Sequence, residues 1–148
     1  MSNSQLQLVA KLEQEKEEKA AMNYQLAQNY VDEQRMKLQG LEQYRLEYFR
    51  NIQQKGQTEG LEAMSFNQHQ GFITKLDSAC EQQRKIIHNA VLAADQRKAI
   101  WLQHQQKRKA VDMLLEKKKQ EALLVEAKLD QKLMDEVATQ RFFRRKAS

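Results

Sequence analysis

Apolar residues recur at alternating spacings of three and four along the first third of the chain. A heptad register with a positions at residues 24, 31, 38, 45 and 52 and d positions at 27, 34, 41 and 48 is apolar at seven of its nine sites. The exceptions are Gln34 and Arg45. This spacing is the period that supercoiled helices require. It predicts a helix over residues 5–54, irregular near its start because the register drifts through Lys16 and Lys19.

A second heptad register runs through most of the remaining chain. Its a positions begin at residue 66 and its d positions at residue 69, and 13 of the 21 sites up to residue 136 are apolar. Gln83, His104 and Arg108 are among the polar sites, so this stripe is interrupted more often than the first. The pattern predicts a second helix over residues 61–143, with residues 144–148 disordered.

Two glycines four residues apart, Gly56 and Gly60, lie in a polar run between the two periodic segments. Glycine in a polar run is typical of a loop, which we expect at residues 55–60. Helices joined by so short a loop run antiparallel. The expected fold class is therefore all-α: one domain over residues 1–148, formed by a long antiparallel two-helix coiled coil.

The two predicted helices differ in length, so the second overhangs the first. If the chain folds back about residue 58, the N-terminal start of the first helix lies opposite residues 110–115. Beyond that point the second helix keeps an apolar stripe that little of this chain remains to cover; it comprises Leu123, Val125, Leu129, Leu133 and Val137. A long uncovered apolar stripe indicates a partner.

The composition supports long helices and excludes most compact folds. The chain has no proline and four glycines, and Ala, Glu, Lys, Arg and Leu make up 71 of its 148 residues. This is the composition of coiled coils. A compact α/β or all-β domain of this length needs many turns, and turns use glycine and proline.

The net charge of +5 lies entirely in the second part of the chain: residues 56–148 hold 17 basic and 12 acidic side chains. Of the basic clusters, 107–109 and 117–119 have acidic residues interleaved and are interpreted as solvated helix faces. In the third, Arg141–Lys146, two phenylalanines adjoin the basic residues. Stacking on nucleic-acid bases and insertion at a protein or membrane surface both remain open for this cluster.

The residues that most enzymes need are missing or far apart. There is no glycine-rich phosphate loop and no metal-ligand spacing, and His69, His88 and His104 are 19 and 16 residues apart. We expect no catalysis, no metal and no cofactor. The lone Cys80 suits a reducing compartment, and no apolar run approaches the length of a membrane span. A cytoplasmic location is expected.

A local aromatic surface is predicted where the two helices approach the loop. Tyr44 and Phe72 both occupy g positions, and g faces g in an antiparallel pair, so their rings should lie together beside the apolar seam. Tyr48 lies one turn beyond Tyr44. The alternative interpretation is a thickened core. We favour a binding surface, because aromatic side chains dominate protein contacts.

The same residues belong to a pattern that resembles the FliJ family, small components of the flagellar type III export apparatus. The pattern comprises Leu41-x-x-Tyr44-x-x-x-Tyr48, Phe72-Ile73-x-x-Leu76-x-x-Ala79-x-Glu81-Gln82-x-Arg84 and Asp130-Gln131-Lys132-x-Met134-Asp135-Glu136. The resemblance implies a coiled coil like the central stalk of rotary ATPases. It implies that the joined terminal ends enter the pore of the hexameric flagellar export ATPase and promote its assembly and activity.

The resemblance also implies contact with the cytoplasmic domain of the export-gate protein FlhA and an escort role for export chaperones. The location is then cytoplasmic, peripherally at the inner-membrane face of the flagellar basal body, with membrane association only through the export apparatus and no nucleic acid bound. Carried over by position, the gate-binding residues are Leu41, Tyr44, Tyr48, Phe72, Leu76 and Ala79. The residues implied to bind the ATPase ring are Leu6, Val9, Leu12, Leu129, Met134 and Val137.

Three other interpretations stay open at the level of sequence. One is the equivalent stalk of a virulence-type secretion system, with the same mechanics. The second is a basic helical nucleic-acid-binding protein, whose affinity would fall steeply with salt. The third is a structural coiled coil that self-assembles.

Overall fold

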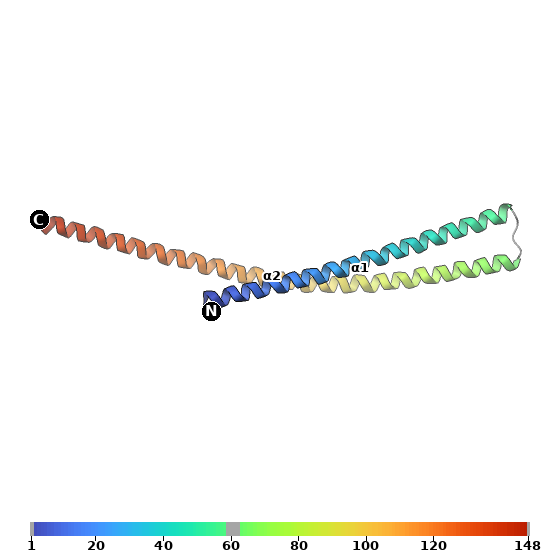
Figure 1. Ribbon diagram of the computed structural model, residues 1–148, viewed down its shortest axis with the longest axis horizontal. Coiled ribbons are helices and arrows are strands. Elements are labelled where there is room, and N and C mark those ends of the chain that lie inside the picture. The colour runs from blue at the N-terminus through green and yellow to red at the C-terminus, as the bar shows by residue number, and fades with distance from the viewer. Residues whose placement is uncertain (1, 59–62, 148) are drawn as a thin grey trace. The chain divides into compact units, whose positions relative to one another are not determined.

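The computed structural model describes residues 2–58 and 63–147. Within these ranges the secondary structure consists of two helices and no strand: α1, Asn3–Thr58, and α2, Ala63–Ala147 (Figure 1). The helices pack against each other in opposite directions. The all-α fold, a long antiparallel two-helix coiled coil, is therefore confirmed.

The helices extend farther than the sequence pattern predicts. α1 continues through Gly56 to Thr58, so four residues of the expected loop are helical. One glycine costs a helix only about 1 kcal/mol, and its neighbours Lys55 and Gln57 tolerate helix well. The expected loop positions 59 and 60 lie outside the described residues, as does Ser148.

The C-terminal residues expected to be disordered are helical as far as Ala147, and that expectation is wrong. Arg144, Arg145 and Lys146 occupy the last turn of α2. Cations at the C-terminal end of a helix interact favourably with the helix dipole, which favours a continuous helix here.

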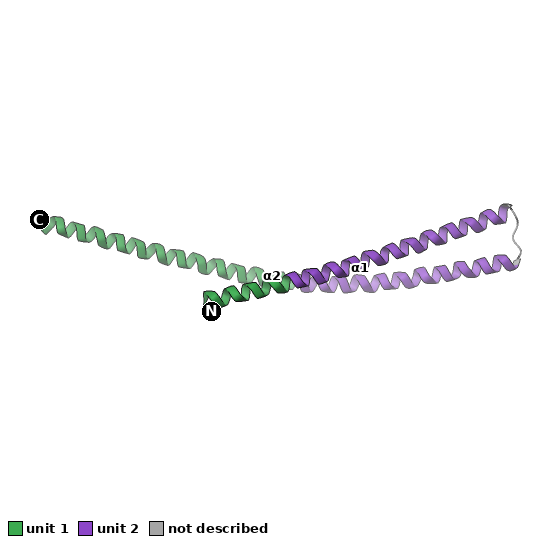
Figure 2. Ribbon diagram, viewed as in Figure 1, with its two compact units in different colours: residues 1–17, 103–148 green, residues 18–102 purple. Residues whose placement is uncertain are grey.

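The chain divides into two compact units, each built from one segment of α1 and one of α2 (Figure 2). Unit 1 comprises Met1–Glu17 and Gln103–Ser148, and unit 2 comprises Glu18–Leu102. The two candidate surfaces described below fall in different units.

The core of unit 2 follows the predicted heptad register. Val31 is 1% exposed and packs in a cluster with Ala27, Ala90 and Ala94, against which Val91 also lies. Small alanines at these sites let the two helices approach closely. Further buried seam residues of this unit are Ala20, Ile52, Ile73, Leu76 and Cys80. The polar interruptions Gln34 and Gln83 are also buried, and they bond to each other.

The start of α1, in unit 1, is regular rather than frayed. Leu6 is buried, and Ala10, Glu13 and Glu17 are half-buried at heptad spacing. The expectation of an irregular start is wrong, because the register does not drift through Lys16 and Lys19 but continues back to Leu6, with the acidic Glu13 and Glu17 in seam positions. Glu17 pairs across the seam with Arg108, which also bonds Asp112 at 2.9 Å.

Pairing within unit 1 also reaches farther along α2 than residues 110–115. Asn3, at the start of α1, lines the same surface groove as Lys118 and Ala122. The chain reverses later than residue 58, because α1 ends at Thr58 and α2 begins at Ala63, so α1 meets a later part of α2. From Glu121 to Ala147 every residue is exposed, and no segment of α1 accompanies the last turns of α2 (Figure 2). The second helix therefore does overhang the first.

Candidate functional site

Three aromatic rings from both helices meet in unit 2, and we call Tyr44, Tyr48 and Phe72 the aromatic patch. The ring centroids of Tyr44 and Phe72 are 6.4 Å apart with an interplanar angle of 86°, an edge-to-face contact. Tyr48 lies 4.7 Å from Phe72 and 6.5 Å from Tyr44. The predicted juxtaposition of Tyr44 and Phe72 is confirmed, and such pairs are stabilising beyond the area they bury.

The residues that the family resemblance assigns to gate binding differ in how much of each is exposed to solvent. Tyr44 is 50% exposed and Phe72 is 36% exposed. Leu41, Tyr48 and Ala79 are half-buried. Leu76 is only 7% exposed and belongs to the core. It lies one turn after Phe72 on α2. A partner would therefore touch the two exposed rings, while Leu76 holds the helix that carries Phe72 in place.

A hydrogen bond orients the inner ring of the aromatic patch. The hydroxyl of Tyr48 and Nδ1 of His69 are 2.5 Å apart, and the two rings also lie in contact at 5.7 Å. Tyr48 occupies a seam position, where a half-buried phenol requires a polar partner at its tip. His69 supplies that partner, so this histidine helps to hold the Tyr48 ring in position.

The apolar surface continues from the aromatic patch along one flank of unit 2. On α2 every seventh residue from Phe72 is apolar and at least partly exposed: Phe72, Ala79, Ile86, Ala93 and Ile100. Ile86 and Ala93 line a groove between the helices with Leu26 and Tyr30 of α1. The surface predicted from the sequence comprised only Tyr44, Tyr48 and Phe72. The seven-residue spacing from Phe72 was the signal that would have extended the flank to Ile100.

The opposite flank of unit 2 carries ion pairs between the helices, although Phe49 of α1 is also exposed there. Arg45 pairs with Asp77, and Arg84 pairs with Glu42 at 3.1 Å. The hydrogen bond from Arg84 to Glu42 raises the pKa of the Arg84 guanidinium, so the charged form is favoured. The two flanks of unit 2 thus differ in chemistry: the ion pairs between the helices lie on this flank, whereas the cluster of aromatic rings and the row of aliphatic side chains lie on the other.

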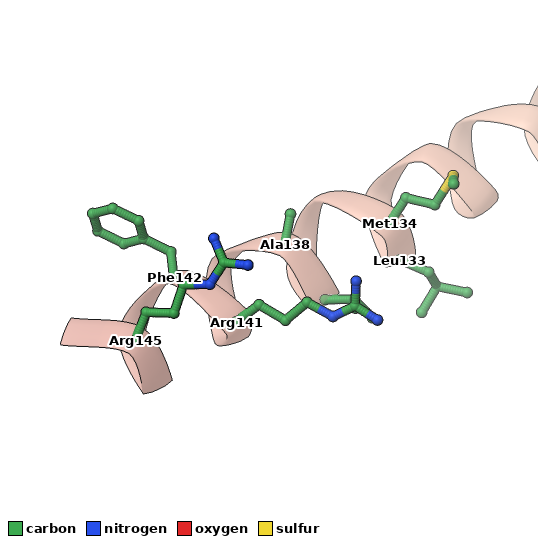
Figure 3. Close-up of a pocket in the computed structure, with 7 residues that line it drawn as sticks. Leu133, Met134, Ala138, Arg141, Phe142 and Arg145 are labelled. Carbon is green, nitrogen blue, oxygen red and sulfur yellow. The ribbon is translucent and has the colours of Figure 1, made fainter. Parts of the chain in front are cut away.

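A second exposed surface lies on α2 in unit 1. Leu133, Met134, Val137 and Ala138 line a shallow hollow with side chains of the basic end of the helix. In Figure 3, Ala138 lies between Met134 and Phe142 along the helix, and Arg141 extends toward Leu133. Farther on, the rings of Phe142 and Phe143 are 6.1 Å apart, and Lys146 lies over Phe142.

The N-terminal residues that the family resemblance assigns to the ATPase ring do not form one surface with this hollow. Leu6 is buried, Val9 is half-buried and Leu12 is exposed. Of the C-terminal residues, Leu129 lines a groove with Asn3, whereas Met134 and Val137 line the separate hollow. The sequence could not separate these roles, because all six residues share a helical apolar pattern.

Among the described residues there is neither a metal-binding cluster nor a membrane-spanning stretch. Residues 2–58 and 63–147 hold no group of three or more His, Cys, Asp or Glu side chains placed to bind a metal ion. Along the same ranges, neither helix has a stretch that is both long and apolar enough to span a bilayer. Cys80 is a buried free thiol.

Comparison with known proteins identifies the family. A family model described as "Flagellar FliJ protein" matches residues 1–147. Searches of curated proteins and of solved structures gave no match. The matched range includes both helices, the aromatic patch and the hollow on α2. The chain belongs to the FliJ family, a family of non-catalytic helical components of flagellar export.

Proposed function

We propose that this protein is a non-enzymatic stalk of the flagellar type III export apparatus, which binds the export ATPase ring and couples it to the export gate. The observation that supports the proposal is the presence of two exposed apolar surfaces in different units. The aromatic patch belongs to unit 2, and the exposed stripe of α2 belongs to unit 1. Two separate surfaces suit a protein that links two partners.

The aromatic patch is the proposed contact for the cytoplasmic domain of FlhA. Tyr44 and Phe72 are exposed, yet the edge-to-face contact and the core beneath them fix their positions. Aromatic side chains held in this way lose little conformational entropy on binding, and they are the residue type most often dominant in interfaces. Leu41, Tyr48 and Ala79 form the rim of the proposed contact.

The C-terminal part of α2 is the proposed contact for the hexameric export ATPase, together with the start of α1. A single helix that is exposed on all sides fits a central pore, where ring subunits surround it. Leu129, Met134 and Val137 supply apolar contacts, and Leu12 supplies one from α1. Binding inside the ring would favour the assembled hexamer by mass action, which explains how such a stalk promotes assembly and activity.

Export chaperones are the third proposed class of partner, and the proposed location is the cytoplasm beside the flagellar basal body at the inner membrane. Membership of the family supports both proposals, and no residue of this chain is assigned to the chaperones.

The test is a binding assay with the full-length chain, the purified FlhA cytoplasmic domain and the purified export ATPase. We expect the chain to retain each partner separately and to retain both together, because the two surfaces do not overlap. The ATPase should also hydrolyse ATP faster when the chain is present. Failure to bind either partner would refute the proposal. Competition between the two partners would refute the assignment of separate surfaces.

A further inference from the structure

The last described residues of α2, 137–147, combine basic and exposed apolar side chains, and we call them the terminal cluster. Val137, Phe142 and Phe143 are each exposed over about half of their surface or more. The cluster has no acidic residue, and its positive charge comes from four side chains: Arg141, Arg144, Arg145 and Lys146. Cations in a last helical turn complement the helix dipole, but that role does not call for exposed phenylalanines beside them.

The charge of α2 changes sign at the start of the terminal cluster. The preceding residues, 121–136, hold five acidic and two basic side chains. Asp135 and Glu136 come directly before the cluster. An anionic surface therefore attracts residues 137–147 and repels the part of the helix before them. Such a surface would meet the end of α2 and would not follow its length.

We propose that the terminal cluster binds the headgroup region of an anionic lipid bilayer, while the acidic residues before it stay in water. Lipid phosphates would pair with the four cations, and Phe142 and Phe143 would reach between the headgroups. The long stems of arginine and lysine let the rings lie deeper than the charges. At 1.5 Å per residue the cluster is about 16 Å long, so the contact stays on one side of the bilayer.

The arrangement of side chains around the helix favours lipid over a partner helix. At about 100° per residue, the four basic side chains spread over about 200° of the circumference, and Phe142 lies between two of them. In Figure 3, Arg141 and Phe142 extend in different directions from the helix. A partner helix contacts a stripe of roughly 100° and would leave some of these charges unmatched. Mobile lipid headgroups can gather around the helix and reach all of them.

Two other anionic partners fit the terminal cluster less completely. Nucleic acid would need the phenylalanine rings as stacking platforms. Lys146 Nζ, however, lies over the Phe142 ring, 5.5 Å from its centroid, and the Phe142 and Phe143 rings are inclined at 71° to each other. An acidic protein pore would pair with the cations but would leave both rings in a polar environment. A bilayer interface offers phosphate and hydrocarbon together. The lipid contact does not rest on the proposed stalk function.

The first test is co-sedimentation of the full-length chain with vesicles of phosphatidylcholine, alone or mixed with about one-third phosphatidylglycerol. We expect the chain to bind the anionic vesicles at least about tenfold more tightly than the neutral ones. Added salt should weaken the binding, because it screens the attraction between the cations and the lipid phosphates. Absence of binding, or equal binding to both kinds of vesicle, would overturn the proposal.

Arg144→Gln combined with Arg145→Gln tests the charges. This double variant should bind anionic vesicles about 10- to 30-fold more weakly than the parent. Lys117→Gln combined with Lys119→Gln is the matched control, because it removes the same charge from exposed residues of a basic cluster that contains no phenylalanine. The control should bind almost as the parent does. Equal weakening of the two variants would mean that net charge alone governs binding, and the assignment to the terminal cluster would fail.

Phe142→Ala combined with Phe143→Ala tests the rings and should weaken binding about 5- to 50-fold. Leu123→Ala combined with Leu124→Ala is its control, because these adjacent leucines are also exposed, at 51% and 62%, but lie in the acidic part of the helix. The control should bind as the parent does. Unchanged binding of the phenylalanine variant would overturn insertion of the rings. Circular dichroism checks the folding of every variant.

The second test locates the contact with an environment-sensitive fluorophore on Gln140→Cys or Gln131→Cys in a Cys80→Ala background. Both glutamines are exposed. Anionic vesicles should shift the emission of the label at position 140 to shorter wavelength and leave the label at position 131 unchanged. A shift at both positions would overturn the confinement of the contact to the terminal cluster. Tighter binding of a single-stranded oligonucleotide than of anionic vesicles, at the same ionic strength, would favour nucleic acid and overturn the proposal.

Discussion

The side-chain amide of Gln83 on α2 donates hydrogen bonds to both the backbone carbonyl and the side-chain oxygen of Gln34 on α1, at 2.9 and 2.8 Å. Both glutamines are buried in the seam of unit 2. They are polar interruptions of two separate apolar stripes, and the fold places them together. A buried amide pair of this kind fixes the axial position of one helix against the other, because only one alignment satisfies both side chains.

Gln83→Leu should lower the stability of the chain by about 1–3 kcal/mol, because it leaves the buried Gln34 side chain without its donor. Chemical denaturation followed by circular dichroism measures this. Replacing both glutamines with leucine should recover or exceed the parent stability, since no buried polar group remains. A single variant as stable as the parent would show that the amide pair does not hold the helices together.

Replacing the two exposed rings of the aromatic patch tests its role in binding. The double variant Tyr44→Ala and Phe72→Ala should weaken binding to the FlhA cytoplasmic domain at least about tenfold, since central aromatic residues typically contribute 2 kcal/mol or more. Isothermal titration calorimetry measures the Kd. The helical signal should stay within error of the parent, because both rings lie outside the core.

Phe49→Ala is the matched control for that experiment. Phe49 is 41% exposed, similar to the patch rings, but its heptad position places it on the opposite flank of α1. We expect this variant to bind FlhA as the parent does. Equal weakening by the control would mean that binding depends on general surface apolarity, and the patch assignment would then fail.

Leu76 and Phe72 should differ in their effects on stability, although they are one turn apart on α2. Leu76→Ala removes a side chain that is 7% exposed, and its expected cost is about 2–4 kcal/mol. Phe72→Ala should cost clearly less, because more than a third of its surface is already in water. Thermal unfolding of the two variants compares them. Equal losses would place Phe72 in the core and argue against its being a contact residue.

Removal of residues 121–148 tests the proposed ATPase contact. A chain that ends at Gln120 keeps the aromatic patch and the pairing of Glu17 with Arg108. It should therefore still bind FlhA, but it should no longer stimulate hydrolysis by the export ATPase. A steady-state ATPase assay measures the stimulation. Full stimulation by the shortened chain would move the ring contact elsewhere on the molecule.

The heptad spacing, together with the short glycine-containing loop, predicted two helices, their antiparallel packing and most of the buried positions. This worked because the period of apolar residues depends only on helix geometry, and the near absence of glycine and proline left no competing structure. Tyr44 and Phe72 could be placed together for the same reason. Two g positions at similar distances from the loop must meet when the chain reverses there.

Only the tertiary structure decided how the helices are aligned along their length and which apolar residues are accessible. Arg108 pairs with Glu17, and Leu76 is buried while Phe72 one turn earlier is not. A repeating pattern defines the buried face of each helix, but every shift by one heptad satisfies that pattern almost equally well. The choice among those alignments depends on particular pairs across the seam, such as Gln34 with Gln83, and these exist only once the two helices have met.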